Sequence, residues 1–133
     1  MAGVDEFAVV VSAGSLRAIA DGAVRFPHRW TAEGVTVEAD FTGAHLLHLS
    51  AASCVLNDLY REAAGRRIDL DGVRVTASGG FDLSDWSSTG ITYEVDLDST
   101  APAADLAALL DHVDRIAEIP RAIRAGAPVW RRS

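Results

Sequence analysis

The stretch TGAHLLHLSAASCVLNDLYREAAG, residues 42–65, decides the fold of this chain of 133 residues. It is too long and alternates too little to form a strand, and small or apolar residues leave little polar surface in its first half. A helix that is apolar on nearly every side belongs inside a domain. We therefore predict a buried helix over residues 44–64, with Gly65 as its C-terminal stop, that carries the only cysteine, Cys54.

Strands are predicted on both sides of this helix. Residues 91–98 alternate apolar and polar side chains at every step, and residues 35–41 and 73–77 do so as well. Such alternation places one face on a core and the other in water, which is typical of antiparallel sheets. Further strands, with glycines at the turns between them, are predicted at residues 7–12, 16–20 and 24–30.

A second helix is predicted after the last of these strands. It begins near residues 100–102, and its apolar residues follow helical spacing up to Ile116. Pro120 is expected to interrupt it, before a short helical turn at residues 121–125 and an edge strand at Val129 and Trp130. The glycines, including the pair at residues 79–80, are expected to lie between elements. The pattern predicts an α+β fold in which an antiparallel sheet packs against a buried central helix and a second, amphipathic helix.

Composition and charge narrow the range of functions. With 49% hydrophobic and 23% charged residues, the chain fits one globular domain over residues 1–133. A net charge of −7 would repel a phosphate backbone, so we expect no nucleic-acid partner. No apolar run is long enough to span a bilayer and the amino terminus lacks the basic start of a signal peptide, so we expect no membrane contact and a cytoplasmic location. The apolar composition also favours a dimer that buries leftover hydrophobic surface.

Several of these segments together resemble the OsmC/Ohr family, the osmotically inducible and organic hydroperoxide resistance proteins. In chain order they are the run from Thr42 to Cys54, LDGVRV (70–75), GITY (90–93), the helix through Val113 and Asp114, and IPRAI (119–123) before Val129. The resemblance extends from about Val35 to Val129. It implies an intertwined homodimer in which antiparallel sheets wrap two central helices, with the active site at the boundary between subunits.

The resemblance also implies roles for particular residues. In the family a peroxidatic cysteine attacks an organic hydroperoxide, an arginine–glutamate pair activates its thiolate, and a second cysteine resolves the resulting sulfenic acid. Cys54 matches the peroxidatic cysteine by its helical setting among small residues. Arg17 is our first choice for the arginine, and Arg25 and Arg29 are the other candidates.

Two functional groups of the family are missing from this chain. Gly43 and Ala44 stand where the family has proline and glutamate, and Ile119 stands where it has the resolving cysteine before a proline. A sulfenic acid at Cys54 would therefore need an external thiol reductant to return to the thiol. Because an ordinary cysteine has a pKa of about 8.5, a guanidinium near Cys54 would also be needed to favour the thiolate.

Other interpretations stay open beside a hydroperoxide reductase. Cys54 can serve as a small buried hydrophobe, and the chain can be a non-catalytic dimer that binds a small apolar ligand or a protein partner. His45 and His48 share a helix face and can suggest a metal site with Asp58. Since Cys54 lies too far along the helix to share an ion easily with His45, we expect no metal and no other cofactor.

Overall fold

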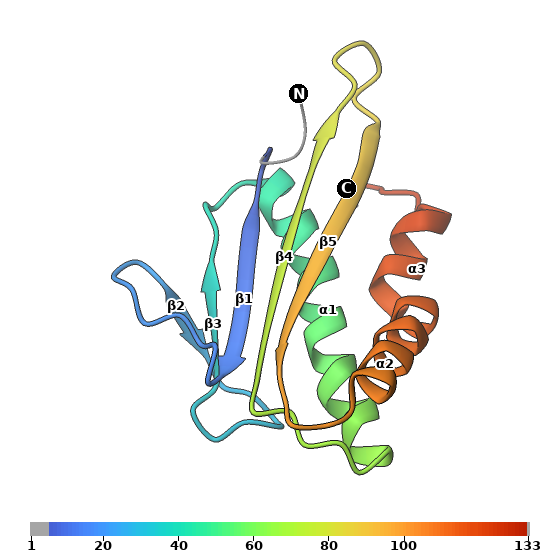
Figure 1. Cartoon of the computed structure of the whole chain (residues 1–133). Helices are drawn as coiled ribbons and strands as arrows, with labels where there is room; N and C mark the ends of the chain where they lie inside the picture. Colours follow the sequence, from blue (N-terminus) through green and yellow to red (C-terminus); the bar gives the residue numbers. More distant parts are fainter. Residues whose placement is uncertain (1–5, 133) are drawn as a thin grey trace.

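The computed structural model describes residues 6–132 (Figure 1). Its central helix begins at Gly43 and ends at Gly65, one residue beyond the predicted bounds at each end, and the side chain of Thr42 caps it by accepting a hydrogen bond from the backbone N–H of His45. In this part of the chain the elements are β1 (Val9–Gly14), β2 (Val24–Phe26), β3 (Val35–Glu38), α1 (Gly43–Gly65), β4 (Gly72–Phe81), β5 (Ser88–Asp98), α2 (Ala103–Ile116) and α3 (Glu118–Ala125).

The described strands form one antiparallel sheet in the order β2-β3-β1-β4-β5. Strand β1 lies at its centre, with Val11 opposite Val37 on β3 and opposite Val75 on β4. The pairing confirms the predicted antiparallel sheet. Strand β5 shows why the prediction worked, because its residues alternate between half-buried and exposed from Ile91 to Asp98.

Residues 16–20, predicted as a strand, are irregular chain that follows a turn at residues 15–16. Gly14 takes a φ of 64° at the end of β1, and the backbone N–H of Arg17 donates to the carbonyl of Gly14 at 3.0 Å. The N–H of Ala18 donates to the side-chain oxygen of the buried Ser12 at 2.9 Å. These local hydrogen bonds use backbone groups that a strand would have offered to a neighbouring strand.

Two further strand predictions need correction at the edges of the sheet. Strand β2 ends at Phe26, well short of residue 30, because Pro27 has no backbone N–H with which to continue the pairing. Val129 and Trp130 do not form an edge strand. They follow Gly126 as irregular chain, with 93% and 80% of their surfaces exposed, so no burial draws this segment to the sheet.

The chain forms two helices here, as predicted, but the break lies at Ala117 and not at Pro120, which is part of α3. A proline inside a continuous helix clashes with the carbonyl four residues before it, here that of Ile116, which is where α2 ends. Ala117 takes an extended ψ of 122°, and α3 then starts at Glu118. Pro120 therefore lies in the first turn of α3, where a missing N–H costs no hydrogen bond.

Gly79 and Gly80 lie inside β4 rather than between elements, contrary to the prediction. A side chain at Gly79 would collide with the carbonyl of Gly90 on β5 and come within 3.1 Å of the imidazole of His48. His48 is completely buried, and its Nδ1 donates to the carbonyl oxygen of Phe7 at 2.9 Å. The glycine thus leaves the space in the sheet that the histidine occupies.

Helix α1 lies against one face of the sheet, where it contacts β1 and β4, and α2 and α3 pack beside it toward β5 (Figure 1). The core between these layers contains Val11, Val75, Leu56, Leu59 and Leu109, all almost completely buried. Strands β2 and β3 extend away from α2 and α3. Within residues 6–132 no helix has the length and apolar character that a membrane span requires.

The C-terminus of α1 closes with a Schellman turn. The N–H of Ile68 donates to the carbonyl of Ala63 at 2.9 Å, and the N–H of Arg67 donates to the carbonyl of Ala64 at 3.2 Å. The residue in the left-handed conformation is Arg67, with a φ of 57°, and not the predicted stop Gly65. An exposed arginine therefore occupies the position that glycine most often takes in this turn.

Replacing Arg67 with glycine should stabilise the protein. The left-handed conformation costs a residue with a side chain about 1 to 2 kcal/mol, and glycine offsets part of the gain through about 0.4 to 1 kcal/mol of chain entropy. We expect the free energy of unfolding in urea, at fixed protein concentration, to rise by about 0.5 to 1 kcal/mol. Arg66→Gly is the matched control: with a φ of −100° it has no strain to relieve, so this variant should be less stable than the wild type.

Candidate functional site

Cys54 lies on α1 at its contact with the start of α3. Its Sγ is 3.4 Å from Oε2 of Glu118 and 3.9 Å from Oδ2 of Asp58, which follows one turn later on α1. A carboxylate only accepts hydrogen bonds, so the thiol is the donor to either of them. The cysteine is half-buried: it packs against the hydrophobic core, and its sulfur also contacts these two carboxylates.

A guanidinium binds both carboxylates through their other oxygens. Nη1 of Arg61 lies 3.2 Å from Oδ1 of Asp58 and 3.5 Å from Oε1 of Glu118. Nε of Arg61 donates to Glu62 at 3.2 Å, and Glu62 is in turn 2.8 Å from Nε2 of His112 on α2. We call Cys54, Asp58, Arg61 and Glu118 the thiol cluster. With Glu62 and His112 it connects all three helices.

The surroundings raise the pKa of the Cys54 thiol above its usual value. Burial is the largest cause, and the negative charges of Asp58 and Glu118 add to it, while a hydrogen bond from the backbone N–H of Ile119 acts in the opposite direction. Cys54 is therefore a neutral thiol at neutral pH. Nucleophilic attack requires the thiolate, so the site must remove a proton before or during any reaction.

The pKa values of the two carboxylates in the thiol cluster are shifted in opposite directions. Asp58 is only 3% exposed, and burial raises its pKa although the positive charge of Arg61 acts against this shift. Glu118 lies at the amino terminus of α3, where a backbone N–H, the Cys54 thiol and Arg61 lower its pKa. Glu118 is thus the more readily ionised acceptor beside the sulfur.

Ile119 follows Glu118, whose carboxylate is 3.4 Å from the Cys54 sulfur, and its backbone N–H lowers the pKa of that thiol, so residue 119 lies near Cys54. This is the position at which the resemblance places the second cysteine of the pair. The proximity of the two positions was expected from that resemblance. It depends on the helix break at Ala117, which turns the first residues of α3 toward α1.

None of the three predicted arginines is found to contact Cys54 within residues 6–132 of one chain. Arg17 is 3.8 Å from Glu33, the guanidinium of Arg29 lies 5.6 Å from the centre of the Trp30 ring, and Arg25 is an exposed residue of β2. The guanidinium that binds Asp58 and Glu118, the two carboxylates beside the sulfur, belongs to Arg61. The sequence analysis did not identify this residue. Its spacing from Cys54 and Asp58, at i+7 and i+3, places all three on one face of a helix and is a pattern that could have identified it.

His45 and His48 do not share a site. His45 Nδ1 is 2.6 Å from the hydroxyl of Thr42 at the start of α1, whereas His48 is buried against Phe7. In the part of the chain that the structure describes, the one group of potential metal ligands is Cys54, Asp58 and Glu118, whose ligand atoms lie within 4.8 Å of one another. Both carboxylates already bind Arg61, whose positive charge opposes a cation there.

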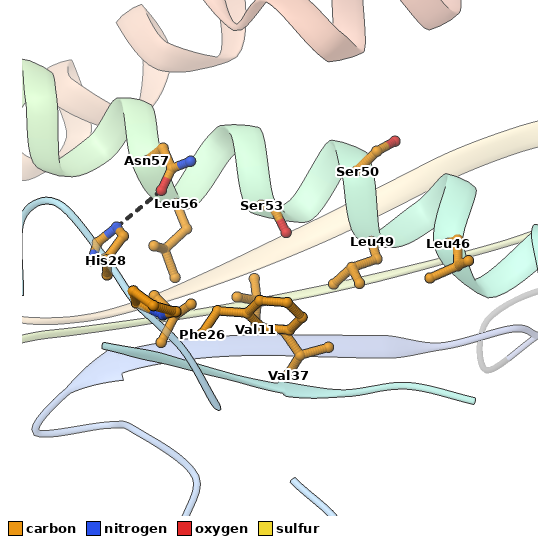
Figure 2. Close-up of a pocket in the computed structure, with 12 residues that line it drawn as sticks. Val11, Phe26, His28, Val37, Leu46, Leu49, Ser50, Ser53, Leu56 and Asn57 are labelled. Carbon is orange, nitrogen blue, oxygen red and sulfur yellow. Dashed lines mark hydrogen bonds between the residues drawn. The ribbon is translucent and has the colours of Figure 1, made fainter. Parts of the chain in front are cut away.

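A groove of about 420 Å³ opens on another side of α1, between this helix and β1 to β3 (Figure 2). Apolar side chains from both sides line it, among them Phe26, Val37, Leu46 and Leu49. At one end His28 on the strand side faces Asn57 on α1, with 2.9 Å between its Nε2 and the amide oxygen. The groove is separate from the thiol cluster, since none of the cluster's residues lines it.

Replacing Ile119 with cysteine should allow a disulfide to Cys54. Because the side chain of Glu118, the preceding residue, reaches to 3.4 Å from the Cys54 sulfur, a thiol at residue 119 starts close to Cys54, as a disulfide requires. After mild oxidation, mass spectrometry should show the loss of a hydrogen from each thiol. Ile123→Cys, one turn further along α3, is the matched control and should keep both thiols free. Equal oxidation of the two variants would contradict the arrangement of α1 and α3.

Comparison with known proteins assigns this arrangement to a family. A family model described as OsmC-like protein matches residues 33–131 of the 133 residues. The matched region contains α1 with Cys54, the hairpin of β4 and β5, and α3 with Ile119, and it confirms the resemblance found in the sequence. No curated protein matches the chain. The chain therefore belongs to the OsmC-like protein family.

Proposed function

We propose that this OsmC-like protein reduces organic hydroperoxides with the thiol of Cys54, as a homodimer in the cytoplasm. The setting of the sulfur supports this proposal. A cysteine kept only for packing is usually surrounded by apolar groups, whereas Cys54 faces two carboxylates and the backbone N–H of Ile119. These are groups that can exchange a proton with the thiol and hold the oxidised sulfur.

The first half of the proposed reaction is attack on the peroxide bond. The thiolate of Cys54 bonds to the terminal peroxide oxygen, the oxygen–oxygen bond breaks, and the alkoxide takes up a proton and leaves as an alcohol. Cys54 becomes a sulfenic acid, so the electron pair that the sulfur loses is the pair that reduces the peroxide.

The second half requires thiols from outside the chain, because Ile119 stands where a resolving cysteine would lie. An external thiol condenses with the sulfenic acid and releases water, which leaves a mixed disulfide on Cys54. Another thiol molecule attacks this disulfide, restores Cys54 and departs as an external disulfide. The reducing cytoplasm contains such thiols, which agrees with the proposed location.

Peroxide consumption by the wild type should rise with pH through the alkaline range. Because burial raises the pKa of Cys54, the thiol remains protonated where an ordinary cysteine has begun to ionise. With an organic hydroperoxide and excess dithiothreitol, the rate should increase about tenfold per pH unit below that pKa. Cys54→Ser should consume peroxide only at the background rate.

Ser53→Ala is the control for this experiment, because Ser53 is the neighbour of Cys54 but lines the groove instead. This variant should keep the wild-type rate. Equal consumption by wild type and Cys54→Ser, together with no sulfenic acid at Cys54, would show that the proposal is wrong.

The exposed apolar side chains at the groove beside α1 support the proposed homodimer. Val24, Phe26 and Leu46 lie on or next to it with 54%, 49% and 37% of their surfaces exposed. A contiguous apolar surface of this kind normally marks an interface, and a second copy would present the same surface for a two-fold contact. Arg17 is bound to Glu33 within one chain, so we propose a role for it only through such a contact.

An acidic side chain in the groove should break the dimer. Phe26→Asp would place a charge in a surface that the second copy is proposed to cover, which carries a large desolvation penalty. Sedimentation analysis should find a dimer for the wild type and a monomer for this variant. Leu83→Asp is the control, because Leu83 is 77% exposed in the loop between β4 and β5, and this variant should remain dimeric. A monomeric wild type would contradict the proposal.

A second function is supported by the groove and by the raised pKa of Cys54 together. An OsmC-like dimer without peroxidase activity would use an apolar cavity to bind a small apolar ligand, and the 420 Å³ groove has the size and lining for one. The Cys54→Ser comparison separates the two functions. Ligand-dependent stabilisation that is equal in wild type and variant, with no peroxide consumed by either, would favour ligand binding.

A further inference from the structure

We propose that Glu118 is the catalytic group that accepts the proton of Cys54 during hydroperoxide reduction, and that Arg61 positions it. This inference rests on the proposed function and adds a proton-transfer residue to it. A glutamate at the start of α3 contacts both the Cys54 sulfur and an arginine on α1, although these residues lie far apart in the sequence.

The two oxygens of Glu118 have different partners. Oε2 accepts the hydrogen bond from the Cys54 thiol at 3.4 Å, whereas Oε1 lies 3.5 Å from Nη1 of Arg61. A general base must lie within hydrogen-bond reach of the proton that it takes, and Oε2 meets this requirement. The contact with Arg61 restrains the carboxylate and leaves Oε2 directed at the sulfur.

Glu118 is better placed for this role than Asp58. Asp58 Oδ2 is farther from the sulfur, at 3.9 Å, and the residue is only 3% exposed. The side chain of Glu118 is 63% exposed, so it can reach both the thiol and a peroxide that approaches from solvent. Arg61 and a backbone N–H at the start of α3 also lower the pKa of Glu118, which keeps it ionised at neutral pH.

The proposed step moves one proton without loss of charge balance. As the sulfur of Cys54 bonds to the terminal peroxide oxygen, the thiol proton passes to Oε2 of Glu118. The oxygen–oxygen bond breaks with both of its electrons going to the departing oxygen, and Glu118 returns the proton to this oxygen to give the alcohol. The carboxylate is regenerated, and Cys54 is a sulfenic acid.

If Glu118 acted only through its negative charge, its replacement by a neutral residue would make Cys54 more reactive and not less. A negative charge beside a thiol favours its protonated form, so removal of the charge makes the thiolate more abundant at a given pH. Alkylation by iodoacetamide needs only the thiolate, because iodide leaves without a proton. Peroxide reduction also needs a proton at the leaving oxygen. The two reactions of the same sulfur therefore distinguish charge from proton transfer.

The experiment measures both rates in the wild type, Glu118→Gln and Glu62→Gln at one pH below the pKa of Cys54. Glu62 is the matched control, because it also binds Arg61 but contacts His112 rather than the sulfur. In Glu118→Gln we expect peroxide reduction to fall about 100-fold while alkylation becomes faster. In Glu62→Gln the ratio of the two rates should stay close to the wild-type ratio.

A rise of both rates in Glu118→Gln would overturn this inference and leave Cys54 as the peroxidatic residue. A wild type whose Cys54 is alkylated but consumes no hydroperoxide would instead overturn the proposed function, and this inference with it. Glutamine fits at the exposed position of Glu118, and alkylation of Cys54 in the variant reports that the site has formed.

Arg61 acts only through Glu118 in this scheme, which a double-mutant cycle can test. Arg61→Met alone should slow peroxide reduction, and Arg61→Lys should restore part of the rate. Added to Glu118→Gln, the methionine variant should cause little further loss. Independent, multiplicative losses would show that Arg61 supports the fold and does not position the carboxylate.

Discussion

Helix α1 has too little polar surface to lie in water, and the rest of the fold is arranged to cover it. Strands β1 and β4 cover one side, and α2 and α3 cover another. Leu56 and Leu59 are almost completely buried as a result. Transfer of each side chain from water to the core contributes about 1.5 to 3 kcal/mol to the stability of the fold. The groove follows from the same constraint, because β2 and β3 leave one side of the helix open within a single chain.

The thiol cluster is the polar exception in this apolar helix. Asp58 is buried and its carboxylate lies 3.2 Å from the guanidinium of Arg61, so both residues bring polarity to the contact between α1 and α3. Carboxylates beside Cys54 disfavour the thiolate, yet they also offer the thiol a proton acceptor. Under the proposed function, such a site would hold its sulfur in the less reactive form until a substrate is present. It would limit both unproductive oxidation and the rate of reaction.

The long periodic segments could be predicted from the sequence because burial acts on one side of β5 and on nearly all sides of α1. Residues 16–20 could not, because hydrogen bonds to Gly14 and Ser12 decide their conformation. Cys54 and Ile119 were found through the family pattern. Arg61 shares a helix face with Cys54 and was within reach of sequence reasoning, but Glu118 enters the cluster only through the packing of α3 on α1, which no local pattern encodes.

The isoleucine at position 119 also determines what limits the protein under the proposed function. A chain with both thiols stores its oxidation internally as a disulfide, and a dedicated protein reductant can then recognise that state. This chain cannot store it in that form, so each turnover draws directly on whatever low-molecular-weight thiols surround it. Its output would track the thiol supply of the cell, and depletion of that supply would convert a catalyst into a stoichiometric scavenger at risk of irreversible over-oxidation.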